Sequence, residues 1–227
     1  MSPAIIKKKR RNKEEASLLY PDGARVLVWR LEEEAPQLLD LCRGAEVPVD
    51  DLLDLPVKRQ REKAAERLLL RHAFGRPVTL GHDEQGAPFV DGIDVNISIT
   101  HTMGLVAVAL DDEQIIGLDA EPMDRRQVVK VRDKFLNASE QRFIAVEDLN
   151  AHVIAWTAKE AVIKAERNSR IDWTEGIRLE PFVPEAQETR LVARVGDRRY
   201  RLLSRPMEGH YITLAVPAAD QRRPVVQ

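Results

Sequence analysis

The sequence contains a single cysteine, Cys42, among its 227 residues. This scarcity excludes an intrachain disulfide and a metal site built from several cysteines, and we expect a cytoplasmic location. The sequence also lacks any apolar run near the roughly 20 residues that a membrane-spanning helix needs. Its formal net charge of -2 gives no reason to expect a broad nucleic-acid-binding surface. We therefore expect a protein that binds neither nucleic acid nor membrane.

The N-terminus does not have the order of a secretory signal, in which charge precedes the apolar segment. Here apolar residues at Pro3–Ile6 come first, and the basic run Lys7–Lys13 follows them. A short run of this kind is typical of a solvated edge strand or a chain end. As the alternative, either this run or the pair Arg125 and Arg126 would form a docking surface for an acidic protein partner.

The chain does contain enough apolar sequence for one sizeable core or two small ones, since 44% of its residues are hydrophobic. In the first half, periodicity and turn residues predict a strand at 26–29 and helices at 32–41 and 57–74. The helix at 32–41 would begin with acidic residues, which suit its dipole. Further on, the pattern predicts one antiparallel meander of three strands, at 95–102, 105–110 and 115–121.

In the second half, the same signals predict a helical stretch up to Phe135, helices at 143–150 and 152–166, and antiparallel strands at 177–179, 190–195, 199–204 and 211–216. The segment 204–216 has the same layout as 98–110: a polar strand end, a glycine-bearing turn and an apolar strand. We therefore predict an α+β fold of two similar, pseudo-symmetric halves, each with a long helix packed on a small antiparallel sheet. The halves would be residues 1–115 and 116–227, with the active site at their interface.

Two carboxylates interrupt the apolar strand Ile115–Glu121. Because side chains alternate along a strand, Asp119 and Glu121 should point the same way. Such a pair either faces water at the end of the strand or holds a cation, a basic side chain or a shared proton. The strand alone leaves both interpretations open.

Basic residues share one face of the predicted helix 57–74. Arg59, Lys63 and Arg67 follow at every fourth position, which makes either ordinary surface or an anion platform. His101, at the end of a predicted strand, would by itself be a hydrogen-bonded structural residue.

The predicted helix 152–166 carries a mixed row at the same spacing. Trp156, Glu160 and Lys164 share one edge, and Lys159 lies on the adjoining row. The alternative interpretation is an exposed ion pair between Glu160 and Lys164, worth a few tenths of a kcal/mol.

Together these residues contain the parts of a magnesium-dependent phosphate site. Asp119, Glu121 and Glu160 can supply oxygen ligands and leave positions for water and phosphate oxygens. The remaining phosphate charge would be neutralised by five basic residues, namely Arg59, Arg67, His101, Lys159 and Lys164. Magnesium on a pyrophosphate makes phosphorus more electrophilic and stabilises the leaving phosphate. Spacing alone leaves the substrate open.

Two of these segments resemble motifs of the 4'-phosphopantetheinyl transferase superfamily. Gly117–Glu121 is similar to its Gly-x-Asp-x-Glu motif and Trp156–Lys164 to its Trp-x-x-Lys-Glu-Ala-x-x-Lys motif, in the family's order and about its distance apart. The resemblance extends to Ser98–Thr102, to Phe135–Leu136 with Glu140, and to the basic helix Arg59–Arg67. The doubled length is similar to the larger, monomeric Sfp-type members.

This resemblance implies a transferase that moves 4'-phosphopantetheine from coenzyme A to a serine of an acyl, peptidyl or aryl carrier protein and releases 3',5'-ADP. It implies Mg2+ held by Asp119, Glu121 and Glu160. The residues near the coenzyme A phosphates would be Arg59, Arg67, His101, Lys159 and Lys164. Glu160 would take the proton of the serine, and Lys164 would stabilise or protonate the departing 3',5'-ADP.

Two positions depart from the family pattern. Thr100 stands where serine is usual, and Ala87 stands where a phosphate-contacting lysine is common. Affinity for the 3'-phosphate would therefore rest on Arg59, Arg67 and His101, or coenzyme A would bind more weakly. Two other functions stay open. One is a non-catalytic module that binds coenzyme A or a carrier protein, and the other is a magnesium-dependent phosphohydrolase that uses water as its nucleophile.

Overall fold

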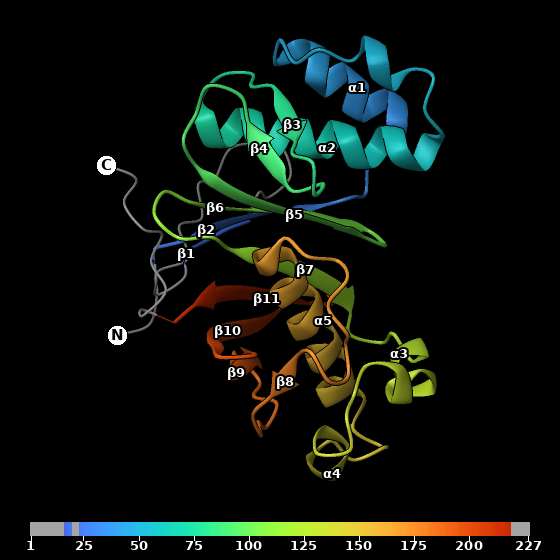
Figure 1. Ribbon diagram of the computed structural model, residues 1–227. Coiled ribbons are helices and arrows are strands. Elements are labelled where there is room, and N and C mark those ends of the chain that lie inside the picture. Colours follow the sequence, from blue (N-terminus) through green and yellow to red (C-terminus); the bar gives the residue numbers. More distant parts are fainter. Residues whose placement is uncertain (1–15, 20–22, 219–227) are drawn as a thin grey trace, which may run out of the picture.

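The computed structural model describes residues 16–19 and 23–218, so the basic run Lys7–Lys13 lies outside the described residues. Two antiparallel sheets pack against each other, with the long helix α2 on the outer face of the first and the long helix α5 on the outer face of the second (Figure 1). The order of layers is therefore helix, sheet, sheet, helix.

The first sheet has the strand order β1-β2-β6-β5. Its strands are β1 (Ala16–Leu19), β2 (Arg25–Arg30), β5 (Asn96–Thr102) and β6 (Leu105–Asp111). The same half contains α1 (Ala35–Gly44), the short η1 (Asp50–Leu52), α2 (Val57–Phe74) and the hairpin β3 (Leu80–His82) with β4 (Pro88–Val90). α2 has its predicted bounds because Pro56 precedes it and Gly75, in the left-handed conformation at φ 68°, ends it.

The second sheet has the strand order β7-β11-β10-β9-β8. Its strands are β7 (Gly117–Pro122), β8 (Arg178–Leu179), β9 (Thr189–Val195), β10 (Arg198–Met207) and β11 (His210–Pro217). Between β7 and β8 lie α3 (Gln127–Lys130), η2 (Arg132–Lys134), α4 (Glu140–Phe143) and α5 (Leu149–Glu166). No helix in the part of the chain described by the structure is long and apolar enough to cross a membrane.

The predicted three-stranded meander is wrong at its third strand. β5 and β6 pair as expected, but β7 pairs with β11, which places Asp119 opposite Thr213 and Glu121 opposite Tyr211. The reason is that β6 is a central strand whose second edge is already paired with β2. The segment between Asp111 and Gly117 therefore carries the chain from one sheet to the other.

Two helix predictions also need correction. α1 begins at Ala35, three residues later than expected, because Glu34 and Gln37 form a capping box and the acidic residues precede the helix. The helix predicted at 143–150 is absent: α4 ends at Phe143, and α5 begins at Leu149 after Asp148 accepts a hydrogen bond from the backbone N–H of Ala151.

The mixed helix and antiparallel sheet content confirms the α+β class. In each half, a first strand is followed by a long helix and then by a hairpin whose last strand inserts beside the first strand, which gives β2-β6-β5 and β7-β11-β10. The symmetry of the halves and their division at 115/116 stay predictions.

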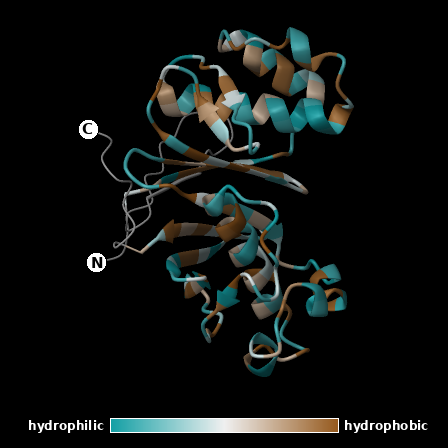
Figure 2. Ribbon diagram, in the orientation of Figure 1, coloured by the Kyte–Doolittle hydropathy of each residue, from teal (hydrophilic) through white to brown (hydrophobic). Residues whose placement is uncertain are grey.

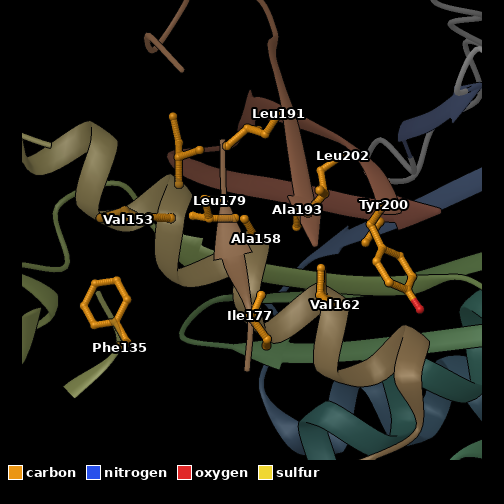
Figure 3. Packing of buried hydrophobic residues seen from close by; sticks show 14 of the residues in the cluster. Phe135, Val153, Ala158, Val162, Ile177, Leu179, Leu191, Ala193, Tyr200 and Leu202 are labelled. Carbon is orange, nitrogen blue, oxygen red and sulfur yellow. The ribbon is translucent and has the colours of Figure 1, made fainter. Parts of the chain in front are cut away.

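Alternation along the strands produces a layered core. On β6, Ala107 faces the second sheet, while Val106 and Val108 face α2, so the whole strand is buried. The largest apolar cluster joins α5 to the outer face of the second sheet (Figure 3). There Val153, Ala158 and Val162 meet Ile177, which directly precedes β8, and the strand residues Leu179, Leu191, Ala193, Tyr200 and Leu202. Figure 2 shows the corresponding apolar stretches where the layers meet.

Cys42 belongs to a smaller cluster between α1 and α2. Its thiol is fully buried, and this burial raises its pKa to about 11. The cysteine is therefore a core residue.

Candidate active site

A seam of polar side chains joins the two sheets along β5 and β7, which are edge strands of different sheets. Ser98, Thr100 and Thr102 share one face of β5. The Ser98 hydroxyl accepts a hydrogen bond from the Leu118 backbone N–H at 2.9 Å. The Thr100 hydroxyl donates to Asp119 at 3.0 Å, and the Thr102 hydroxyl donates to Glu121 at 3.2 Å. The alternation of β5 therefore matches that of β7 and orients both carboxylates.

Asp119 lies at the centre of this seam and is 6% exposed. Its Oδ1 accepts from Thr100 and, at 2.9 Å, from the Lys164 ammonium, which also donates to the Leu118 carbonyl at 2.7 Å. Its Oδ2 is buried and has no hydrogen-bond partner among the described residues. One oxygen of a buried carboxylate is thus left for a further ligand.

Glu121 forms an ion pair with Arg125, whose guanidinium stands 5.2 Å from the ring centroid of Trp156. Trp156 in turn packs against Phe135 and Trp173. The side chains of Asp119 and Glu121 are 9% and 15% exposed, so the carboxylate pair does not face open water. That excludes the solvent-facing interpretation of this strand.

Glu160 lies on α5 beside the same carboxylates. Burial, followed by the nearby charge of Asp119, raises the pKa of the Glu160 carboxyl above its ordinary value, against the opposing effects of Lys164 and Arg125. Lys164 forms its ion pair with Asp119, so the alternative of an exposed surface pair between Glu160 and Lys164 is wrong.

The three carboxylates do not form a ready-made metal cage. Among residues 16–19 and 23–218, no group of three or more His, Cys, Asp or Glu side chains is arranged to hold a metal ion. The residues nevertheless fit a hard cation, because the Asp119 Oδ2 is buried without a partner among the described residues and the charge of Asp119 makes the nearby Glu160 carboxyl harder to ionise.

A cavity of about 350 Å³ adjoins the seam and is walled by both halves of the chain. Lys164 belongs both to the cavity, which it lines, and to the seam, where it forms an ion pair with Asp119. The other cationic or titratable side chains of the lining are Arg59, Lys63, Glu66, His82, His101 and Arg167. The Gln85–Pro88 turn closes one side. Such a cationic cavity suits an anionic ligand.

The wall of the cavity contains a buried carboxylate, Glu66, that no sequence pattern indicated. Glu66 is 2% exposed, receives two hydrogen bonds from the Lys63 ammonium at 2.9 and 3.0 Å, and lies 2.8 Å from His101 Nε2. Although burial acts to raise it, the contacts with His101 and Lys63 hold the pKa of Glu66 below its ordinary value. Glu66 therefore fixes two of the cavity's basic side chains.

Arg67 does not line the cavity with Arg59, His101 and Lys164. Its guanidinium binds Asp51 on η1 at 2.8 Å and the carbonyl of Pro48 at 2.6 Å. Each step of four residues turns a helix by about 40° beyond a full circle, and Arg67 lies two such steps after Arg59. The two side chains therefore point in clearly different directions around the helix axis. In this structure its guanidinium is therefore engaged away from the cavity, and its contact with coenzyme A phosphates stays a prediction.

Lys159 also lies outside the cavity. It is fully buried, and its ammonium donates to Glu140 at 2.7 Å and to the carbonyls of Trp173 and Ile177 at 2.7 and 2.9 Å. Adjacent helical residues point about 100° apart, so Lys159 and Glu160 cannot both face the seam. All three donors of this ammonium are used, and the predicted phosphate contact is replaced by a structural role.

We therefore expect Lys159→Ala to destabilise the protein by about 3 kcal/mol, because Glu140 and two carbonyls are left buried without their donor. Affinity of the folded protein for coenzyme A, the ligand implied by the resemblance, should not change. Urea unfolding and calorimetric titration measure the two effects. Lys134→Ala, at an exposed position, is the matched control and should change stability by less than about 0.5 kcal/mol. Weaker coenzyme A binding at unchanged stability would return Lys159 to the binding site.

A protein-family model matches part of this chain. Residues 115–215 match the family model of the 4'-phosphopantetheinyl transferase superfamily, a range that runs from just before β7 almost to the end of β11. A comparison with curated proteins found no match. The matched range contains Asp119, Glu121, Glu160 and Lys164. The part of the chain formed by residues 115–215 therefore belongs to the 4'-phosphopantetheinyl transferase superfamily.

Proposed function

We propose that this protein transfers 4'-phosphopantetheine from coenzyme A to a serine of a carrier protein, in a magnesium-dependent reaction that releases 3',5'-ADP. The observation that carries the proposal is the position of Lys164. This ammonium lines the cationic cavity and simultaneously holds Asp119 of the matched motif, so the anion-binding region and the carboxylates meet at one side chain.

The cavity would receive the phosphates of coenzyme A. Arg59 and His101 approach it from the first half of the chain, and Lys164 from the second. Binding across both halves buries the charged end of the substrate and strengthens each ion pair by excluding water. Glu66 would keep the His101 ring in place during this step.

Asp119, Glu121 and Glu160 would hold the magnesium ion. When bound, the ion supplies charge neutralisation for the pyrophosphate and makes the attacked phosphorus more electrophilic. Thr100 and Thr102 keep the strand carboxylates oriented through their hydroxyl hydrogen bonds. Arg125, which pairs with Glu121, would have to share or give up that carboxylate.

The proton of the acceptor serine would pass to Glu160, directly or through water. A raised pKa makes the Glu160 carboxylate a stronger base than an ordinary one. As the serine oxygen forms its bond to the phosphorus that carries pantetheine, the bond to the adenylate phosphate breaks. Lys164 would stabilise the negative charge that develops on the departing 3',5'-ADP.

The acceptor would be an acyl, peptidyl or aryl carrier protein, and it supplies the nucleophile. We expect a monomeric, cytoplasmic enzyme. Arg126, next to the paired Arg125, would contribute to docking an acidic carrier, a contact that increases the association rate at low salt.

Mass spectrometry of a panel of apo carrier proteins, incubated with coenzyme A, magnesium and this protein, tests the proposal. A gain of one phosphopantetheine on the carrier, abolished by a chelator, is the expected result. Breakdown of coenzyme A without any acceptor would instead favour a phosphohydrolase. Binding of coenzyme A by calorimetry, with no modified carrier across the panel, would favour a non-catalytic module.

A further inference from the structure

We infer that Arg167 is the cavity residue that binds the 3'-phosphate of coenzyme A, a conclusion that rests on the function proposed above. Arg167 immediately follows α5 and lines the same cavity as Lys164. Its guanidinium lies 3.6 Å from the carboxylate of Asp83, in the turn between β3 and β4. Arg167 thus links the end of α5 to the other half of the chain.

Arg167 lies just past the end of α5, which separates it from the reacting end of the cavity. Lys164, one turn earlier, holds Asp119 and would serve the pyrophosphate. Arg167 lies three residues beyond Lys164 in the chain, at the left-handed residue that ends the helix, and both side chains line the cavity. Coenzyme A carries its pyrophosphate on the 5' carbon and its third phosphate on the 3' carbon of the same ribose. Two cations at this spacing suit two phosphates on one sugar.

The ion pairs of the cavity lining differ in length. Arg59 is held by Glu62 at 2.8 Å, Lys63 by Glu66 at 2.9 Å, and Lys164 by Asp119 at 2.9 Å. The pair between Arg167 and Asp83 is the longest of the four, and each side chain is 31% exposed. A long, partly exposed ion pair contributes little free energy to stability. Arg167 can therefore leave Asp83 and bind a phosphate with little loss of stability.

Asp83 can lose its contact with Arg167 and still keep its own place in the turn. Its Oδ1 accepts hydrogen bonds from the backbone N–H groups of Gln85 and Ala87 at 2.9 and 2.8 Å, which anchors the turn. Only Oδ2 faces the guanidinium. A phosphate brings more negative charge and accepts two parallel hydrogen bonds from arginine, so it competes effectively for this side chain.

The backbone of Arg167 is in the left-handed conformation, φ 52° and ψ 32°, which favours glycine over arginine. Its N–H caps the helix by donating to the Lys164 carbonyl at 3.1 Å, a bond that any residue but proline can make. Arginine is therefore not required by the turn. Substitution by glycine therefore removes the guanidinium while keeping the backbone conformation and the N–H that caps the helix.

Calorimetric titration with coenzyme A and with dephospho-coenzyme A, which lacks only the 3'-phosphate, tests the inference. We expect Arg167→Gly to weaken coenzyme A binding about tenfold and leave dephospho-coenzyme A binding unchanged. The melting temperature should stay the same or rise, since glycine suits the backbone there. Arg170→Ala, at an exposed position outside the cavity lining, is the matched control and should bind both ligands normally.

Asp83→Asn provides a second variant with an effect of opposite sign. Asparagine can still accept the turn hydrogen bonds but no longer competes for Arg167 or repels a phosphate, so coenzyme A should bind a few-fold more tightly. Equal losses of both ligands in Arg167→Gly would overturn the inference while leaving the proposed function intact. Failure of the unmodified protein to bind either ligand would overturn both.

Discussion

Gly117→Ala is expected to destabilise the protein by more than about 4 kcal/mol and to abolish activity. A Cβ at this position would lie 1.8 Å from the Ala161 carbonyl oxygen and 2.6 Å from the Ala165 backbone nitrogen. Both are backbone atoms of α5, which cannot rotate away as a side chain can. β7 and α5 would have to separate, and Lys164 would lose its bonds to Leu118 and Asp119.

Thermal and urea unfolding measure this effect. A loss of that size should lower the melting temperature by roughly 8 °C or more in a chain of this length. The control is Gly44→Ala, at the end of α1, where an added Cβ meets nothing within 4 Å and φ is ordinary. That variant should be neutral or gain up to about 1 kcal/mol. A Gly117→Ala protein as stable as the parent would show that α5 and β7 are not in close backbone contact.

Glu160→Gln is expected to lower the rate of phosphopantetheine transfer by about 10²- to 10⁴-fold, because glutamine keeps the shape of the side chain but cannot accept a proton. Coenzyme A affinity and the melting temperature should change little. These effects are measured by transfer kinetics with the apo form of a carrier that the protein modifies, by calorimetry and by thermal unfolding.

The rate at high magnesium concentration distinguishes the two roles proposed for Glu160. If the carboxylate only helps to hold the ion, excess magnesium should restore much of the rate; if it also takes the serine proton, the loss should persist. Glu147→Gln makes the same chemical change at an exposed position shortly before α5 and should leave the rate unaltered. Undiminished transfer by Glu160→Gln would remove the catalytic assignment.

Local signals predicted the elements that carry the site. α2 has its predicted bounds because proline and glycine mark its two ends. The apolar pattern predicts a strand over Ile115–Glu121, and the structure has β7 at Gly117–Pro122. The family resemblance includes Gly117 without giving the reason for a glycine there, which is the close approach of α5. These features depend on neighbours in sequence or on composition.

Non-local contacts could not be predicted in the same way. β7 pairs with β11, about ninety residues further along the chain, because β6 was already paired on both edges. Helical spacing grouped Lys159 with Glu160 and Arg67 with Arg59, but only the packing of the helices decides which basic side chains reach the cavity. Glu66 carried no sequence signal at all, since its role depends on a strand partner, His101.

The seam between β5 and β7 sets how the two sheets are aligned. Apolar packing between the sheets holds them together without fixing a lateral position, since such contacts are non-directional. The bonds from Ser98, Thr100 and Thr102 to β7 are directional, and a slip of the sheets by one residue would break all three together. The alignment of the two sheets therefore depends on the same hydroxyl groups that orient the acidic side chains. A shift of one sheet against the other would also change the orientation of the carboxylates.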